Sequence, residues 1–310
     1  QLGPAGFGAY GYVFTWAMVI GSVLSLGLGQ LSVRELPKYL ALSQHSALRG
    51  YLAYWVACLV TTGTIAAVIL AALDSGGWFR FDVGWPLVLL VAITHATVLS
   101  LSSFLSGFQR FFQSMFFESV FRQSLFLGAV LLCIVLQFEL DAARIIKLSV
   151  MTVVPVIIVM VYLVHQSVSN VTGAALGPIE LKSLSWLAAS LPLMLGSLTN
   201  QIQNSLDTLV LGAMVEDSAL GLFRAASRGA ELAMIAQGLA FTILGPILSR
   251  TLALENRDEA QSLISQSAVL SSFLGLSICA ILAAFPGTYL GLFGVGFREA
   301  TPILLILVAT

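Results

Sequence analysis

The residues best suited to chemistry lie in two neighbouring apolar stretches, 187–211 and 219–247. The polar side chains of each stretch recur at helical spacing, so they line one face of each predicted helix. These residues are Asn200, Gln203, Asn204 and Asp207 in the first stretch and Arg224, Arg228 and Glu231 in the second. A charge at the centre of a bilayer costs about 2.5–3.5 kcal/mol, so the charged members need partners or water. The pattern therefore predicts a polar cavity inside a membrane protein.

Folding the two stretches as a hairpin places their polar side chains at matching depths. The predicted pairs are Asp207 with Arg224, Gln203 with Arg228, and Asn200 with Glu231. Arg228 is also three residues from Glu231 on the same helix, so a purely structural ion-pair network remains an alternative to a substrate-facing role.

A second pair of charges, Glu118 and Arg122, occupies positions i and i+4 of one predicted helix. Two interpretations remain open for this pair. It forms a local ion pair whose long stems reach the membrane surface, or it takes part in charge pairing or ion coupling within the cavity.

Other motifs carry less information. The three cysteines each lie alone in an apolar run, without the spacing of metal ligands. Residues 6–11 satisfy the pattern G-x-G-x-x-G, but no strand precedes them and no acidic residue follows about 20 positions later, which excludes a dinucleotide site. We expect these glycines to shape a turn at the membrane interface. No cofactor is predicted.

The composition identifies the class of protein. The chain is 58% hydrophobic and only 9% charged, whereas soluble domains contain about 25% charged residues. The net charge of -1 provides no basic field for nucleic acid. We therefore predict an all-α polytopic membrane protein that binds no nucleic acid.

We count nine predicted spans, eight of them apolar stretches long enough to cross a membrane and a ninth that the end of the chain cuts off. They are 12–32, 51–73, 86–106, 115–137, 145–165, 187–211, 219–247, 264–287 and a stretch that opens at Thr301. The last stretch is short, so we interpret the chain as a fragment of a longer protein. Segments 33–50, 107–114, 166–186 and 248–263 hold seven basic residues, against four in the loops between them, which predicts that these four segments are cytoplasmic.

The chain divides at its longest polar interruption into two similar halves. We predict an N-terminal lobe over 1–165 that lacks its first helix, a cytoplasmic linker over 166–186, and a truncated C-terminal lobe over 187–310. Gly8-Ala9-Tyr10 corresponds to Gly221-Leu222-Phe223, and the outer-loop sequence Trp78-Phe79-Arg80 corresponds to Gly296-Phe297-Arg298. Parallel repeats of this kind build transporters.

The ordered set of motifs resembles the bacterial polysaccharide exporters, the flippases of O-antigen and capsule repeat units. The resemblance covers nearly the whole chain, although each motif is degenerate. The motifs are Leu2-Gly3-Pro4, Gly8-Ala9-Tyr10-Gly11, Val33-Arg34, Asn200, 207–212, Gly221-Leu222-Phe223-Arg224-Ala225-Ala226, 246–249, Leu292-Phe293-Gly294 and Phe297-Arg298-Glu299-Ala300.

The resemblance implies the fold of the multidrug/oligosaccharidyl-lipid/polysaccharide exporters, in which two six-helix lobes surround a central cavity and alternate access to it. It implies the inner (plasma) membrane, a polyprenyl-diphosphate-linked oligosaccharide as substrate, and contact with membrane lipid. A polysaccharide polymerase and the export machinery are the partners to expect.

Under this reading Arg224 and Arg228 bind the diphosphate, and Asn200, Gln203 and Asn204 bind sugar hydroxyls. Asp207 and Glu231 pair with the arginines in the empty cavity or bind a proton or Na⁺. Two other functions remain in play. They are a cation-coupled drug antiporter of the same superfamily and a membrane-embedded polysaccharide polymerase, which the absence of a long loop disfavours.

Overall fold

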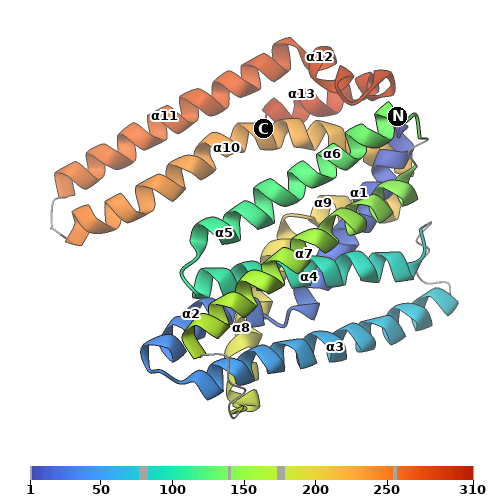
Figure 1. Ribbon diagram of the computed structural model, residues 1–310. Helices are drawn as coiled ribbons and strands as arrows, with labels where there is room; N and C mark the ends of the chain where they lie inside the picture. The colour runs from blue at the N-terminus through green and yellow to red at the C-terminus, as the bar shows by residue number, and fades with distance from the viewer. Residues whose placement is uncertain (1, 77–82, 139–140, 173–178, 254–256, 310) are drawn as a thin grey trace. The chain divides into compact units, whose positions relative to one another are not determined.

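The computed structural model describes residues 2–76, 83–138, 141–172, 179–253 and 257–309 (Figure 1). All regular elements within these ranges are helices. Six described helical segments are long and apolar enough to cross a membrane, which confirms the predicted all-α polytopic membrane fold. These are α1 (Gly3–Leu24), α3 (His45–Ser75), α4 (Trp85–Gly107), the continuous run Phe111–Val135, α7 (Ala142–Thr172) and α11 (Arg257–Ala284).

The other predicted spans fall on helices outside this set of six, so the count of nine spans stays a prediction. The run from Phe111 consists of α5 (Phe111–Met115), η1 (Phe116–Phe121) and α6 (Arg122–Val135). The remaining helices are α2 (Leu28–Ala41), α8 (Ser183–Gln203), α9 (Leu206–Met214), α10 (Asp217–Ala253), α12 (Pro286–Gly291), η2 (Val295–Ala300) and α13 (Thr301–Ala309). The outer-loop motif Trp78-Phe79-Arg80 and linker residues 173–178 lie outside the described residues.

The predicted span 12–32 is broken where α1 ends and α2 begins. Leu26 and Gly27 have φ angles of 48° and 68°, which lie in the left-handed region and cannot continue a helix. A side chain at Gly27 would also strike α8, because its Cβ would lie 2.5 Å from the Ser190 carbonyl oxygen. The break thus lets the backbone of the turn approach α8 closely.

The predicted span 187–211 is also divided, between α8 and α9. The Ser205 amide donates to the Ile202 carbonyl at 3.0 Å, an i→i+3 bond that tightens the last turn of α8. Asp207 therefore lies in the first turn of a new helix, where a carboxylate interacts favourably with the helix dipole.

The helices pack into two compact units. The first unit comprises residues 9–213 and the second comprises residues 1–8 and 214–310. The lobes predicted from the sequence, 1–165 and 187–310, rest on the internal repeat rather than on packing, and they stay a prediction.

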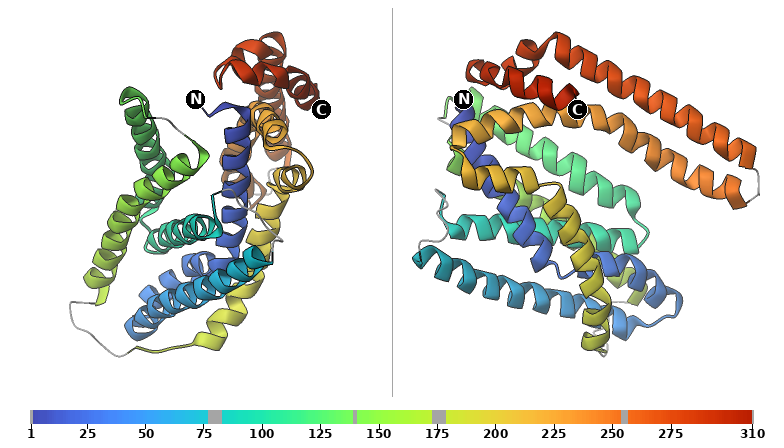
Figure 2. Two further views of the ribbon diagram at one scale, coloured as in Figure 1. Left: turned by 90° about the vertical axis from the view of Figure 1, so that its right-hand side faces the viewer. Right: turned by 180° about the vertical axis from the view of Figure 1, so that it is seen from behind.

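In the first unit, α4 is the central helix and packs against α2, α3 and α7 (Figures 1 and 2). An aromatic cluster lies where α3, α4 and α8 meet. Tyr51 stands edge-on to Trp186 with ring centroids 5.2 Å apart, and Trp55 stands edge-on to Phe104 at 5.1 Å. Such pairs contribute about 0.5–1.5 kcal/mol each beyond the burial of their area.

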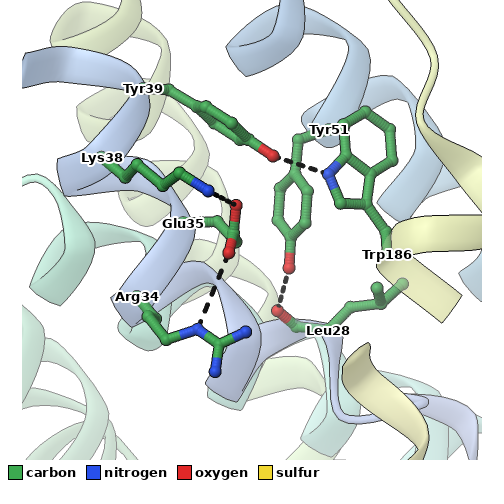
Figure 3. A network of polar contacts seen from close by, with 7 residues as sticks. All are labelled: Leu28, Arg34, Glu35, Lys38, Tyr39, Tyr51 and Trp186. Atoms are coloured by element: carbon green, nitrogen blue, oxygen red, sulfur yellow. Dashed lines mark hydrogen bonds and ion pairs between the residues drawn. The ribbon is translucent and has the colours of Figure 1, made fainter. Parts of the chain in front are cut away.

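Two buried hydrogen bonds hold this cluster to α2 (Figure 3). The Trp186 Nε1–H donates to the Tyr39 hydroxyl at 2.7 Å, and the Tyr51 hydroxyl donates to the Leu28 carbonyl at 2.5 Å. Burial raises the pKa of Tyr39 to about 12, so its hydroxyl is neutral at physiological pH. On the same helix, Glu35 Oε1 lies 3.6 Å from Arg34 Nε, and Glu35 Oε2 lies 3.8 Å from Lys38 Nζ.

Polar contacts also gather three connecting segments at one end of the first unit. The Glu180 amide donates to the Ser46 carbonyl at 3.1 Å, and Arg110 Nη1 donates to Gln166 Oε1 at 3.2 Å. The basic-residue count assigns the segments joined here to one side of the membrane: 33–50, 107–114 and 166–186. The three segments lie at the same end of the unit, which agrees with that assignment, while the cytoplasmic orientation stays a prediction.

The second unit is built on α10 and α11, which lie side by side as a long hairpin (Figure 1). Helices α12, η2 and α13 pack against the N-terminal part of α10. Phe7 from the start of α1 joins this core, with its ring centroid 5.8 Å from those of Phe293 and Phe297.

Candidate functional site

The first turns of α1 and α10 cross in the second unit at two glycines. A Cβ at Gly8 would overlap the carbonyl oxygen of Asp217, and a Cβ at Gly221 would overlap the carbonyl oxygen of Pro4. The contact is reciprocal, because Asp217 precedes Gly221 by four residues as Pro4 precedes Gly8. Only glycine at both positions permits this separation.

This crossing changes the interpretation of the glycines in residues 6–11. They do not shape an interfacial turn, since all of them lie inside α1. Gly8 instead serves the close approach of two helices, as small residues do in membrane proteins. The glycines in contact are the two that the predicted internal repeat places in correspondence.

Beside the crossing, the second unit contains a cavity of about 700 Å³. Its lining residues are Phe7, Arg228, Glu231, Leu232, Tyr289, Leu292 and Phe293. The cavity is therefore walled by apolar and aromatic side chains and carries one cation and one anion. This combination, apolar walls with a few polar groups, is typical of small-molecule sites.

The two charged groups of the cavity pair with each other. Arg228 Nη1 donates to Glu231 Oε2 at 2.6 Å, across the i,i+3 spacing that the sequence left open. Both side chains are about half exposed, at 55% and 53%. An exposed pair of this kind contributes at most about 1 kcal/mol, so an anionic ligand can compete for the guanidinium at little cost.

Tyr289, which belongs to α12, also lines the cavity. Its hydroxyl donates to the Ala225 carbonyl at 3.1 Å. Burial, followed by the negative charge of Glu231, raises the pKa of Tyr289, which keeps the phenol neutral. Gly229 makes room for the ring, since a Cβ there would lie 2.9 Å from Tyr289 Cε1.

The other predicted site residues fall in different places. Arg224 lies one turn before Arg228 on α10, and its Nε atom is buried. Asn200, Gln203, Asn204 and Asp207 are exposed residues of the first unit, at the junction of α8 and α9. Each predicted cross-helix pair joins one residue of each unit, so these pairings stay predictions.

Glu118 and Arg122 lie on the run Phe111–Val135 of the first unit, at a π-helical segment. Arg122 Nε donates to the backbone carbonyl of Glu118 at 3.0 Å. The Glu118 carboxylate accepts a hydrogen bond from the hydroxyl of Ser102 on α4. π-Helical turns occur frequently at functional sites.

Sequence reasoning missed two kinds of residue. The serines linked to Glu118 could have been noticed from spacing, because Ser102 and Ser106 share a helix face and Ser114 precedes Glu118 by four residues. No local pattern pointed to Tyr289, and Phe293 entered only as part of a family motif; both reach the cavity from a distant part of the chain.

Comparison with protein families gives a match over most of the chain. A family model described as polysaccharide biosynthesis protein matches residues 1–252. No match was found among curated proteins or among solved structures. The matched range includes the predicted site residues on α8, α9 and α10. The chain belongs to the polysaccharide biosynthesis protein family.

Proposed function

We propose that this chain is part of an alternating-access flippase, not an enzyme, and that it moves a polyprenyl-diphosphate-linked oligosaccharide across the inner membrane. Membership of a polysaccharide biosynthesis family and six helices able to span a membrane support the general role. The observation that carries the specific role is the guanidinium of Arg228 in an aromatic-walled cavity.

The chemistry of the cavity fits the charged head of such a substrate. A guanidinium binds phosphate oxygens through two parallel hydrogen bonds and keeps its proton in a poorly hydrated place. The volume of about 700 Å³ lies in the range of small-ligand sites. The cavity therefore suits the diphosphate and its first neighbours, while the rest of the glycan extends beyond it.

Glu231 has a defined part in this proposal. Its carboxylate holds Arg228 in the empty cavity and releases it when the diphosphate arrives. The exchange is cheap because both side chains are already half exposed. A coupling cation, a proton or Na⁺, would neutralise the released carboxylate.

One observation favours a second function, export of lipophilic cations. The cavity holds a carboxylate together with Phe7, Tyr289 and Phe293, and aromatic faces attract cations. In that case Glu231 contacts the substrate and Arg228 is its resting partner.

Complementation of a flippase-null bacterial strain tests both functions. Surface polysaccharide and drug resistance are measured together with the amount of protein inserted in the membrane. We expect Arg228→Gln to insert normally and to lower export by roughly 10- to 100-fold, the loss of one charge-assisted contact. Arg228→Lys should keep part of the activity. Arg298→Gln, which removes an exposed arginine of the same unit outside the cavity lining, is the control.

The double variant Arg228→Gln with Glu231→Gln separates binding from mutual neutralisation. If the pair is only structural, removing both charges restores polysaccharide export. Full export from the double variant would therefore overturn the role of Arg228 in binding. Drug resistance without surface polysaccharide would favour the cation exporter.

A further inference from the structure

A continuous chain of hydroxyl groups leads from the turn between α4 and α5 to the carboxylate of Glu118. The Ser106 hydroxyl donates to the Ser114 hydroxyl at 2.9 Å, and the hydroxyls of Ser114 and Ser102 lie 2.7 Å apart. The Ser102 hydroxyl donates to Glu118. The Ser114 hydroxyl lies within hydrogen-bond distance of the Ser102 carbonyl oxygen, at 2.9 Å, as well as of the Ser102 hydroxyl, so it can donate its proton to either. A hydroxyl can donate and accept at the same time, which is the requirement for passing a proton along the chain.

The burial of these residues distinguishes a buried end and an exposed end of the hydroxyl chain. Ser102 and Ser114 are 4% and 3% exposed, whereas Ser106 is partly exposed beside the turn. Arg110 stands in that turn and bonds Gln113 and Gln166. Water at the turn therefore reaches Ser106, and the two buried hydroxyls connect it to Glu118.

The spacing of the oxygen atoms favours a proton over a metal ion. A cation held at about 2.3–2.6 Å by several oxygens keeps those oxygens about 3.4 Å apart. The hydroxyl oxygens here lie 2.7 and 2.9 Å apart, which is hydrogen-bond separation. The described hydroxyls are therefore arranged as a hydrogen-bonded chain.

The charged and titratable groups around Glu118 are few. Arg122 donates to the backbone carbonyl of Glu118 and interacts electrostatically with Glu118, with Tyr10 of α1 and with His95 of α4. The Nδ1 atom of His95 is buried without a hydrogen-bond partner among the described residues. On α7, which packs against η1, the ionisable side chains are exposed. They are Arg144, Lys147, Tyr162 and His165.

We infer that Glu118 is a proton-binding site of the transporter, filled through Ser106, Ser114 and Ser102 from the end of the unit that holds the α4–α5 turn, and emptied toward the other side of the membrane when the transporter alternates its access. In loading, each hydroxyl accepts one proton and passes on its own, so the serines are unchanged and Glu118 becomes a neutral carboxylic acid. Protonation removes a charge from a membrane-spanning helix, where charge is costly. The inference rests on the proposed function, because it supplies the coupling ion of that transporter.

The test uses purified protein in liposomes that contain a pH-sensitive dye. One arm imposes a pH gradient alone and measures proton entry. The other adds fluorescent polyprenyl diphosphate and compares its flipping with and without the gradient. We expect wild-type protein to conduct protons and to flip the probe faster with the gradient.

The variants assign the route. Glu118→Gln should abolish proton entry and bring the ratio of gradient-driven to passive flipping to about one. Ser102→Ala and Ser114→Ala should each slow proton entry by roughly tenfold, which corresponds to one lost hydrogen bond, and Ser102→Thr should restore the rate that Ser102→Ala loses. Ser103→Ala is the matched control, because the Ser103 hydroxyl donates within its own helix, to the Leu99 carbonyl 2.9 Å away.

The outcomes separate the two proposals. Proton entry that is equal in wild type and Glu118→Gln overturns the proton site, even if the probe is flipped. Proton entry that depends on Glu118 without any flipping of the probe supports the site and contradicts the proposed substrate. If Ser103→Ala slows proton entry as much as Ser102→Ala does, the hydroxyl chain is not the route.

Discussion

The glycine crossing of α1 and α10 makes a sharp prediction about packing. Gly8→Ala places a Cβ 2.8 Å from the Asp217 carbonyl carbon and 2.9 Å from the Gly221 nitrogen, whereas ordinary contacts are 3.4–4 Å. These neighbours are backbone atoms and cannot rotate away. Because the Asp217 carbonyl oxygen would lie nearer still, the helices must separate by roughly 1–1.5 Å, which forfeits about half or more of the dispersion energy at the crossing.

The size of the effect follows from two opposing contributions. Overpacking costs up to about 3 kcal/mol, and alanine gains about 1 kcal/mol over glycine in a helix. We expect Gly8→Ala and Gly221→Ala each to destabilise the protein by about 2 kcal/mol, which lowers the melting temperature by about 4–8 °C. The double variant should lose less than the sum, because one separation of the helices accommodates both methyl groups.

Thermal unfolding of the detergent-solubilised protein at a fixed scan rate measures these shifts. Gly6→Ala is the control on the same helix, since its Cβ would meet only the flexible side chain of Leu2 at 3.1 Å. Gly196→Ala is a second control, with nothing within 4 Å of its Cβ. Melting temperatures equal to those of the controls, or strictly additive losses, would refute the reciprocal contact.

Three further predictions concern other parts of the chain. Reporter fusions at Lys182 and Gln261 should read cytoplasm and those at Ser75 and Asp217 the outside; a reversed pattern would invert the orientation derived from the basic residues. Neutralising either Asp207 or Arg224 should lower the protein yield, and the exchange Asp207→Arg with Arg224→Asp should recover part of it; a double variant no better than the worse single variant argues against pairing. Trp186→Phe should lower stability by about 1 kcal/mol by removing the bond to Tyr39, while Trp186→Phe combined with Tyr39→Phe should add little; an additive loss would contradict that coupling.

Part of the fold was predictable from composition and spacing. The scarcity of charge predicted a helical membrane protein, and six helices meet that expectation. The repeat pointed to corresponding glycines, and Gly8 and Gly221 proved to be in contact. The i,i+3 spacing of Arg228 and Glu231 allowed the ion pair that forms. These features depend on local periodicity, which a single sequence displays directly.

Other features depend on contacts that a single sequence does not display. The break at Leu26 and Gly27 was missed because glycine is common in membrane helices and the close approach to Ser190 is a tertiary contact. The i,i+4 spacing of Glu118 and Arg122, which suggested a local ion pair, was misleading for a similar reason. In a π-helical turn the i,i+4 spacing no longer stacks two side chains as in an α-helix, and the carboxylate turns to Ser102 on another helix.

The reciprocal crossing of α1 and α10 also bears on how the two halves of this chain can change. When one residue meets its own counterpart, the contact has the form of an isologous interface, the kind that two identical subunits make about a twofold axis. In a homodimer of a half-length chain, a single glycine would serve both sides of such a contact, and any mutation there would alter both helices at once. In this chain Gly8 and Gly221 are separate positions, so each half can change its own chemistry around a shared point of contact.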